Sequence, residues 1–162
     1  MTYFFKKLNK ILNKCLTTNL KNCVFIYMSS ITIKKGKEKR KIPKTYVPDS
    51  LTPADRKKQI KSIKEEKPRP KVKSFKSKRS SYVVAFEKKY GTKITDKAFI
   101  YKNIISKKGV ELILDKGKAA YFSSGSRPNQ TPASWSNARL ASVIMNGPAR
   151  KVDKKIWDKY KK

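Results

Sequence analysis

The apolar residues that could form a folded core are unevenly distributed, and this distribution constrains the chain more than any other feature. Residues 31–79 contain 19 lysines and arginines against 5 acidic residues, and only about a fifth of their positions are apolar. Such a segment buries too little surface to offset the entropy lost on ordering. Residues 80–162 hold most of the aromatic residues and all but one of the 6 glycines. We therefore predict a mostly α protein, with a small helical domain over 80–162 preceded by an extended basic arm over 31–79.

Capping residues predict where several helices begin. Thr52-Pro53 predicts one short helix inside the arm, over about 53–64, and Pro68 and Pro70 follow as helix breakers. The pair Thr131-Pro132 predicts a second such start, with a helix over 132–146. Further helices are predicted in SSYVVAFEKKYG, from Thr95 or Asp96 through Ile105, and after Asp153. Val110–Leu114 fits a helix or a strand, and KAAYFSSGSRPNQ is predicted as a loop or extended stretch.

The first 30 residues form a separate segment with five lysines and no acidic residue. Apolar residues at steps of 3 and 4 predict an amphipathic helix over about 3–20, which could be a surface anchor, a targeting peptide or a helix that packs on a partner. The alternative is that translation begins at Met28. Cys15 and Cys23 could form a disulfide or remain free, and the absence of cysteine elsewhere favours a reducing compartment.

The charge balance excludes most catalytic chemistry. The chain has 42 Lys and Arg, 11 Asp and Glu and no His, for a net charge of +31. Without histidine there is no His-based catalysis and no ordinary mixed-ligand zinc site, so we expect no enzyme activity, no metal, no cofactor and no small-molecule substrate. A Ser-Lys dyad with Lys118 has no support in the sequence. Self-repulsion at this charge favours a polyanionic partner, with nucleic acid or a protein expected ahead of a membrane.

The segment YFSSGSRPNQTP, residues 121–132, is the strongest local candidate for anion binding. Its hydroxyl groups, its glycine turn, Arg127 and the start of the following helix would all favour an anion. The alternative is a structural loop whose polar side chains satisfy the backbone. It does not match a phosphate-binding P-loop.

Arginine and tryptophan residues of the C-terminal half have two interpretations each. Arg139 could contact a phosphate or carboxylate, or form an internal salt bridge with its stem on Trp135. Trp135 and Trp157 could stack on bases, but the core role is the stronger prediction for both. The residues that we predict to contact a protein partner or DNA phosphate are Arg40, Arg56, Lys57, Lys58, Arg69, Lys76, Lys78, Arg79, Ser124, Ser126, Arg127, Arg139, Arg150 and Lys151.

Several strings over residues 46–161 carry a family resemblance. They are YVPDSLTPADRKKQIKSI, FEKKYG, ISKKGVELIL, GKAAYFSSGSRPNQTPASWSNARLASVIMNG and ARKVDKKIWDKY. With these the chain resembles an uncharacterised domain family of large nucleocytoplasmic DNA viruses, the giant viruses of algae and amoebae. Similar sequences tend to read SWARARL where this chain has Asn137 at the earlier arginine. The resemblance implies a viral origin, with the protein in the virion and, during infection, in the virus factory of the host cytoplasm.

Two functions fit these observations. The first is a minor capsid or internal cement protein whose basic arm threads between capsid subunits and orders on binding. The alternative is a basic virion protein that binds the double-stranded DNA genome through phosphate contacts during packaging or compaction. A weaker third hypothesis places the helix over 3–20 on a membrane surface during virus assembly.

Overall fold

The computed structural model describes residues 30–35 and 38–162, and the predicted helix over 3–20 and both cysteines lie outside them. The described residues are mostly helical, which confirms the predicted fold class. They divide into two compact units, the first ending at Thr45 and the second running from Tyr46 to Lys162. Each unit is described by itself.

The first unit contains a β-hairpin that the sequence analysis did not predict. Strand β1 (Ser30–Lys35) pairs antiparallel with β2 (Glu38–Pro43), and Ile31 lies opposite Ile42 in the register. The run Ile31-Thr32-Ile33 is β-branched throughout, which favours a strand, and Ile33 and Ile42 are buried. The short 3-10 helix η1 (Lys44–Tyr46) follows β2. This part of the predicted arm is therefore extended, as expected, but its two strands are hydrogen bonded to each other in a hairpin.

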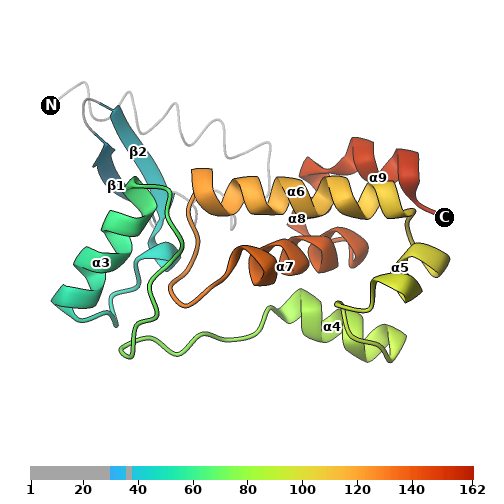
Figure 1. The fold of residues 1–162 in the computed structure, drawn as a ribbon, viewed down its shortest axis with the longest axis horizontal. Coiled ribbons are helices and arrows are strands. Elements are labelled where there is room, and N and C mark those ends of the chain that lie inside the picture. Colours follow the sequence, from blue (N-terminus) through green and yellow to red (C-terminus); the bar gives the residue numbers. More distant parts are fainter. Residues whose placement is uncertain (1–29, 36–37) are drawn as a thin grey trace, which may run out of the picture. The chain divides into compact units, whose positions relative to one another are not determined.

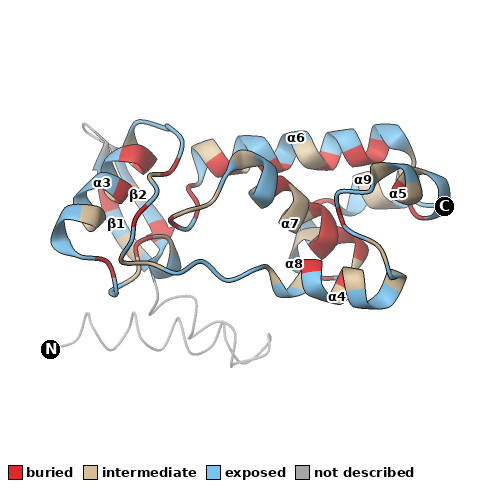
Figure 2. Ribbon diagram, turned by 60° about the horizontal axis from the view of Figure 1, so that its bottom comes forward, coloured by how far each residue is buried: buried red, intermediate tan, exposed pale blue. Residues whose placement is uncertain are grey.

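The second unit is built around two helices that lie side by side. Helix α6 (Lys107–Ser123) packs against α7 (Pro132–Ile144) in the most extensive contact of this unit (Figure 1). Helices α4 (Ser81–Tyr90) and α8 (Pro148–Val152) pack on α7, and α9 (Lys154–Tyr160) packs on α6. The two remaining helices are α3 (Pro53–Lys64) and α5 (Lys97–Asn103). The buried residues gather on the facing sides of these helices (Figure 2) and include Phe86, Ile100, Val110, Ile113, Leu140 and Val143.

The two helix starts predicted at Thr-Pro pairs are confirmed in detail, whereas Ser80 before α4 and Asp153 before α9 make no side-chain capping hydrogen bond. The Thr52 hydroxyl accepts a hydrogen bond from the backbone N–H of Asp55 at 3.3 Å, and α3 spans the predicted residues. Thr131 and Ser134 form a reciprocal capping box at the start of α7. Helix α4 ends at Tyr90 and is capped by Gly91, whose φ of 64° is the left-handed conformation that glycine adopts most easily.

Helix α6 is longer than predicted. Residues 110–114 are helical, and the first part of KAAYFSSGSRPNQ forms the last turns of α6 up to Ser123, so the loop prediction is wrong there. The reason is tertiary contact, because Tyr121 is fully buried and its hydroxyl is hydrogen bonded. Gly117 contributes by letting the helices approach, since a Cβ at this position would lie 2.7 Å from Ser136 Cα on α7. Helix α8 was not predicted and begins at Pro148.

The compact helical unit also begins earlier than predicted. It starts at Tyr46, so residues 46–79, which the sequence analysis assigned to the arm, fold with residues 80–162. Burial of Val47, Leu51, Ile63 and Val72 accounts for this difference. These few apolar side chains are buried in the helical unit. Their burial offsets the conformational entropy that this basic segment loses when it is ordered.

Candidate nucleic-acid interface

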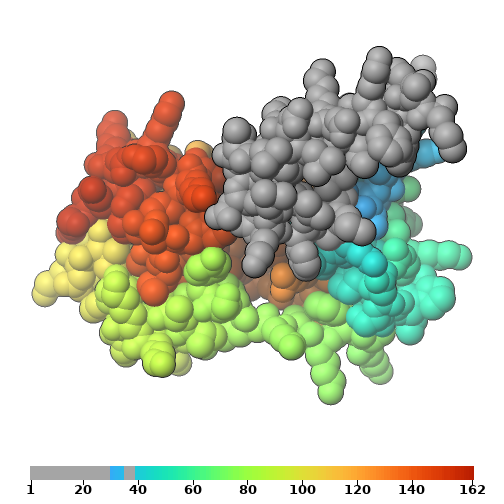
Figure 3. Space-filling view, turned by 180° about the vertical axis from the view of Figure 1, so that it is seen from behind, coloured from blue at the N-terminus to red at the C-terminus, as the bar shows by residue number. Residues whose placement is uncertain are grey.

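A fixed basic segment connects α3 to α4. Residues 67–79, which we call the strap, have no regular helix or strand and run along one edge of the second unit (Figures 1 and 3). Most of the strap is exposed, but Arg69 and Val72 are only 6 % exposed. These two residues mark where the strap is held on the helices.

Arg69 is the first anchor of the strap. Its backbone N–H donates to Tyr121 Oη at 2.7 Å, and its Nη2 donates to the Tyr121 carbonyl at 2.6 Å. Its Nη1 donates to the carbonyls of Ser62, at 3.0 Å, and of Lys67. The guanidinium lies 4.8 Å from the centre of the Tyr121 ring, and burial lowers the pKa of Arg69. One arginine thereby joins the end of α3, the strap and the end of α6.

Asn129 is the second anchor, and its side chain acts as a backbone substitute for the strap. Its Oδ1 accepts from the Val72 N–H at 2.7 Å, while its Nδ2 donates to the carbonyls of Val72 at 3.0 Å and Phe75 at 2.6 Å. The residue has a positive φ of 60°, a conformation that asparagine tolerates better than most residues. The Asn129 side chain therefore satisfies backbone groups of the strap that a neighbouring β-strand would otherwise pair.

A third contact holds the middle of the strap on α3. The Ser74 hydroxyl donates to Asp55 Oδ2 at 2.6 Å, and this hydrogen bond is the main cause that lowers the pKa of Asp55. A lowered carboxyl pKa means that the contact stabilises the fold while Asp55 is ionised and is lost as the pH falls through that pKa. The strap is thus attached at three points within about seven residues.

Between these anchors and in the residues that follow them, the strap exposes a row of cations. Lys71, Lys73, Lys76 and Lys78 are exposed, and no described carboxylate lies within ion-pair distance of any of them. Seven residues of extended chain span at most about 25 Å, which is the length of several phosphates along one strand of DNA. Because the backbone is already fixed, these lysines offer charge without the cost of ordering the segment.

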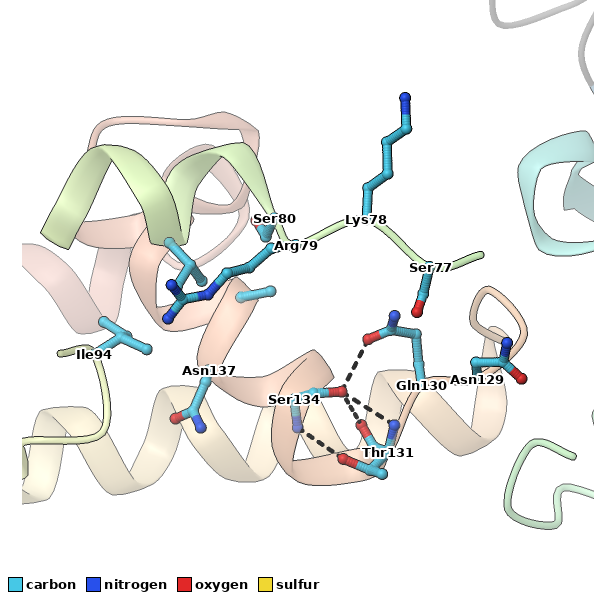
Figure 4. A pocket seen from close by; sticks show the side chains of 12 residues that line it. Ser77, Lys78, Arg79, Ser80, Ile94, Asn129, Gln130, Thr131, Ser134 and Asn137 are labelled. Carbon is cyan, nitrogen blue, oxygen red and sulfur yellow. Dashed lines mark hydrogen bonds between the residues drawn. The ribbon is translucent and has the colours of Figure 1, made fainter. Parts of the chain in front are cut away.

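A pocket of about 390 Å³ opens where the strap enters α4 (Figure 4). One side is formed by residues 77–80 and the other by residues 129–131 and the first turns of α7. Val83, Ile94 and Ala138 supply apolar surface, and its lining contains no acidic residue. Figure 4 shows Lys78 extending away from the pocket, while Ser77 faces Gln130. Arg79 Nη2 donates to Glu87 Oε1 at 2.5 Å, which leaves its other N–H groups for other partners.

A partly buried lysine lies behind the pocket and fixes one of its amides. Lys97 Nζ donates to Asn137 Oδ1 at 2.8 Å and to the Ile94 carbonyl at 2.6 Å. Burial lowers the pKa of Lys97 to about 8. Because Lys97 occupies the amide oxygen of Asn137, the Nδ2 group of Asn137 keeps both of its donors.

This lysine predicts a pH dependence of stability. Between pH 8 and the ordinary lysine range, the unfolded chain binds more protons at position 97 than the folded chain. The contribution of Lys97 to the free energy of unfolding should therefore rise with pH over this window. Urea unfolding at pH 7.5 and pH 10 should show a larger gain for the natural chain than for Lys97→Met. An equal gain in both chains would contradict the assignment.

The structure corrects three of the predicted contact residues. Arg69 is buried as described above. Arg139 makes a two-pronged ion pair with Asp153, through Nε at 2.7 Å and Nη2 at 2.9 Å, so the internal salt bridge is confirmed. Arg150 donates to the carbonyls of Val143 and Ile144 and lies 3.9 Å from the centre of the Trp157 ring. These guanidinium groups make hydrogen bonds within the fold.

The loop at residues 124–127 also serves the fold more than a ligand. Ser126 is fully buried, and its carbonyl accepts a hydrogen bond from Gln59 Nε2 at 2.9 Å. Ser124 and Arg127 are exposed, and the structure does not bring them to the pocket. Trp157 packs on the core, which confirms its core role, and Trp135 meets Tyr46 edge to face with ring centres 5.6 Å apart.

The other predicted contact residues lie on the surface in separate places. Lys57, Lys58 and Lys151 are exposed, and Arg56 lies 3.7 Å from Asp49. Arg40 belongs to β2 of the first unit and is half-buried. Of the predicted set, Lys76, Lys78 and Arg79 are exposed together on the strap, whereas Arg69 on the same strap is buried. Sequence reasoning missed Lys71 and Lys73, although two lysines around the apolar Val72 are the pattern of a one-sided extended segment.

Within the described residues, no helix is long and apolar enough to cross a membrane, and no cluster of three or more metal-ligating side chains occurs. The chain belongs to DUF5824, a family of unknown function whose profile matches residues 43–159. The matched region includes the strap, its anchors and the pocket. No curated protein and no solved structure shows a significant match to the chain.

Proposed function

We propose that this member of DUF5824 is a non-enzymatic DNA-binding protein that contacts phosphates through the lysines of its strap. One observation carries the proposal. The strap is held by buried contacts at Arg69 and Val72, while four of its five lysines face solvent without described carboxylate partners. These four are Lys71, Lys73, Lys76 and Lys78. A fixed row of unpaired cations is what a polyanion binds with least ordering cost.

The charge of the whole unit supports the same proposal. Residues 46–162 contain 30 lysines and arginines and 10 acidic residues, a net charge of +20. Arg69, Arg139 and Arg150 are used inside the fold, so the outward charge comes mainly from lysine. Lysine is a point charge that contacts phosphate without reading bases, so binding should be weakly sequence-specific.

The attached strap favours DNA over the capsid role. Threading between capsid subunits needs a segment that is free to order on binding, and residues 46–79 are part of a compact unit. The resemblance to a family of large DNA viruses makes the viral genome the expected DNA, with the virion and the virus factory as the expected locations. A role as minor capsid protein is the competing outcome of the experiment below.

The experiment is a titration of the full chain with a short random-sequence duplex at several salt concentrations. We expect log K to fall steeply and linearly with log salt, with a slope that corresponds to at least four phosphate contacts, or about −3.6. Binding that is insensitive to salt would overturn phosphate contact as the mechanism. Binding that vanishes well below physiological salt would also overturn the proposal, and would assign the charge to a protein partner such as a capsid subunit.

A further inference from the structure

We infer that the pocket at the end of the strap binds one unpaired nucleotide of a nucleic-acid strand. This inference rests on the proposed function, because the strand would reach the pocket along the strap lysines. The two features are continuous in the chain, since Ser77, Lys78 and Arg79 belong to the strap and also line the pocket (Figure 4). A strand that follows the strap therefore reaches the pocket at the end of the strap next to α4.

The lining of the pocket fits the parts of a nucleotide. Val83, Ile94 and Ala138 offer an apolar surface that a planar base can cover. The side-chain amides of Gln130 and Asn137 lie beside this surface and can hydrogen bond to a base edge. The pocket volume of about 390 Å³ is within the range of small-ligand sites.

The charge around the pocket fits the phosphate. Arg79 contributes to the lining, Lys78 extends away from the pocket on the side from which a strand would arrive, and the lining contains no carboxylate (Figure 4). The pairing of Arg79 with Glu87 uses one of its nitrogens and holds the guanidinium in place. A paired base cannot reach this surface, because its edge is already hydrogen bonded within the duplex. The site would thus select an unpaired nucleotide.

Asn137 determines which hydrogen-bonding groups the pocket offers to a ligand. Its amide oxygen is taken by Lys97 at 2.8 Å, so the amide presents donors. Donors match the acceptor atoms that every base carries on its edges. Replacing Asn137 by aspartate keeps the shape, removes both donors and adds a negative charge beside the phosphate site.

The test is a titration of the isotopically labelled full chain with the four deoxynucleoside 5′-monophosphates, followed by backbone amide shifts. We expect saturable shifts at Ser77, Gln130 and Asn137. Inorganic phosphate and the free deoxynucleosides should bind about tenfold or more weakly, because each lacks half of the contacts. Asn137→Asp should weaken monophosphate binding by about tenfold or more, and so should Ala138→Phe, which fills the pocket. Lys108→Gln, outside the pocket on α6, should leave it unchanged.

Equal binding of inorganic phosphate would overturn the inference, because the site would then hold only an anion. Absence of shifts at the pocket would overturn it as well. Its failure is separable from failure of the proposed function. A chain that binds duplex in a salt-dependent way but ignores mononucleotides refutes the pocket alone, and a chain that binds mononucleotides but not DNA refutes the DNA-binding function alone.

Discussion

Replacing Asp153 by alanine is expected to lower the free energy of unfolding by about 3 to 5 kcal/mol. Asp153 is 1 % exposed and accepts two hydrogen bonds from Arg139, with Lys116 Nζ 3.5 Å from its Oδ1. It stands between α8 and α9 and ties both to α6 and α7. The variant would leave the largely buried guanidinium of Arg139 without its counter-charge, which is the costly part of breaking such a pair.

Equilibrium unfolding of the full chain in urea measures this effect. The matched control is Asp158→Ala, which removes an exposed carboxylate paired with Lys154 on the same helix. The control should unfold close to the natural chain, since exposed ion pairs contribute little. An Asp153 variant whose midpoint equals that of the control would contradict the role of this ion pair.

Replacing Arg69 by methionine is expected to release the strap. The variant loses charge-assisted hydrogen bonds to three carbonyls and the contact with the Tyr121 ring, at a cost of about 3 kcal/mol. Because trypsin cleaves after lysine, a released strap exposes Lys71, Lys73 and Lys76 to it. If the loss is local, the open state becomes about 100-fold more populated, and cleavage at these lysines should accelerate by a similar factor.

The control for this experiment is Arg127→Met, which removes an exposed arginine from the neighbouring loop. Its strap should be cleaved at the natural rate. Cleavage of the Arg69 variant at the natural rate would show that Asn129 and Ser74 hold the strap without Arg69. Uniform cleavage over the helices would instead indicate global unfolding, which urea unfolding of the same variant would detect.

The sequence predicted those elements whose signals are local. The hydroxyls of Thr52 and Thr131 each accept a hydrogen bond from the backbone N–H three residues later. Because these contacts are local, the sequence around each threonine was enough to predict the starts of α3 and α7. The internal use of Arg139 was also predicted, as one of two alternatives. A planar fork between helices is a common role for the few arginines of a lysine-rich chain.

The strap could not be predicted because its contacts are distant in the chain. Arg69 meets Tyr121 across 52 residues, and Asn129 meets Val72 across 57. Composition alone describes residues 67–79 as a free arm, since it cannot show that one buried arginine and one asparagine fix the backbone. The pocket could not be predicted for the same reason, because its lining combines residues of the strap with residues of α7 that are distant in the sequence. Local propensity also missed the end of α6, where burial of Tyr121 extends the helix.

The most direct test of the strap is the salt dependence of duplex binding by two variants of equal charge. The first replaces Lys71, Lys73, Lys76 and Lys78 by glutamine, and the second replaces the exposed Lys88, Lys93, Lys107 and Lys108. Compared with the natural chain, the slope of log K against log salt should be smaller in magnitude by about 3 to 4 in the first variant. In the second variant the slope should decrease in magnitude by about one or less. Equal slopes in both variants would contradict the strap as the phosphate-binding surface.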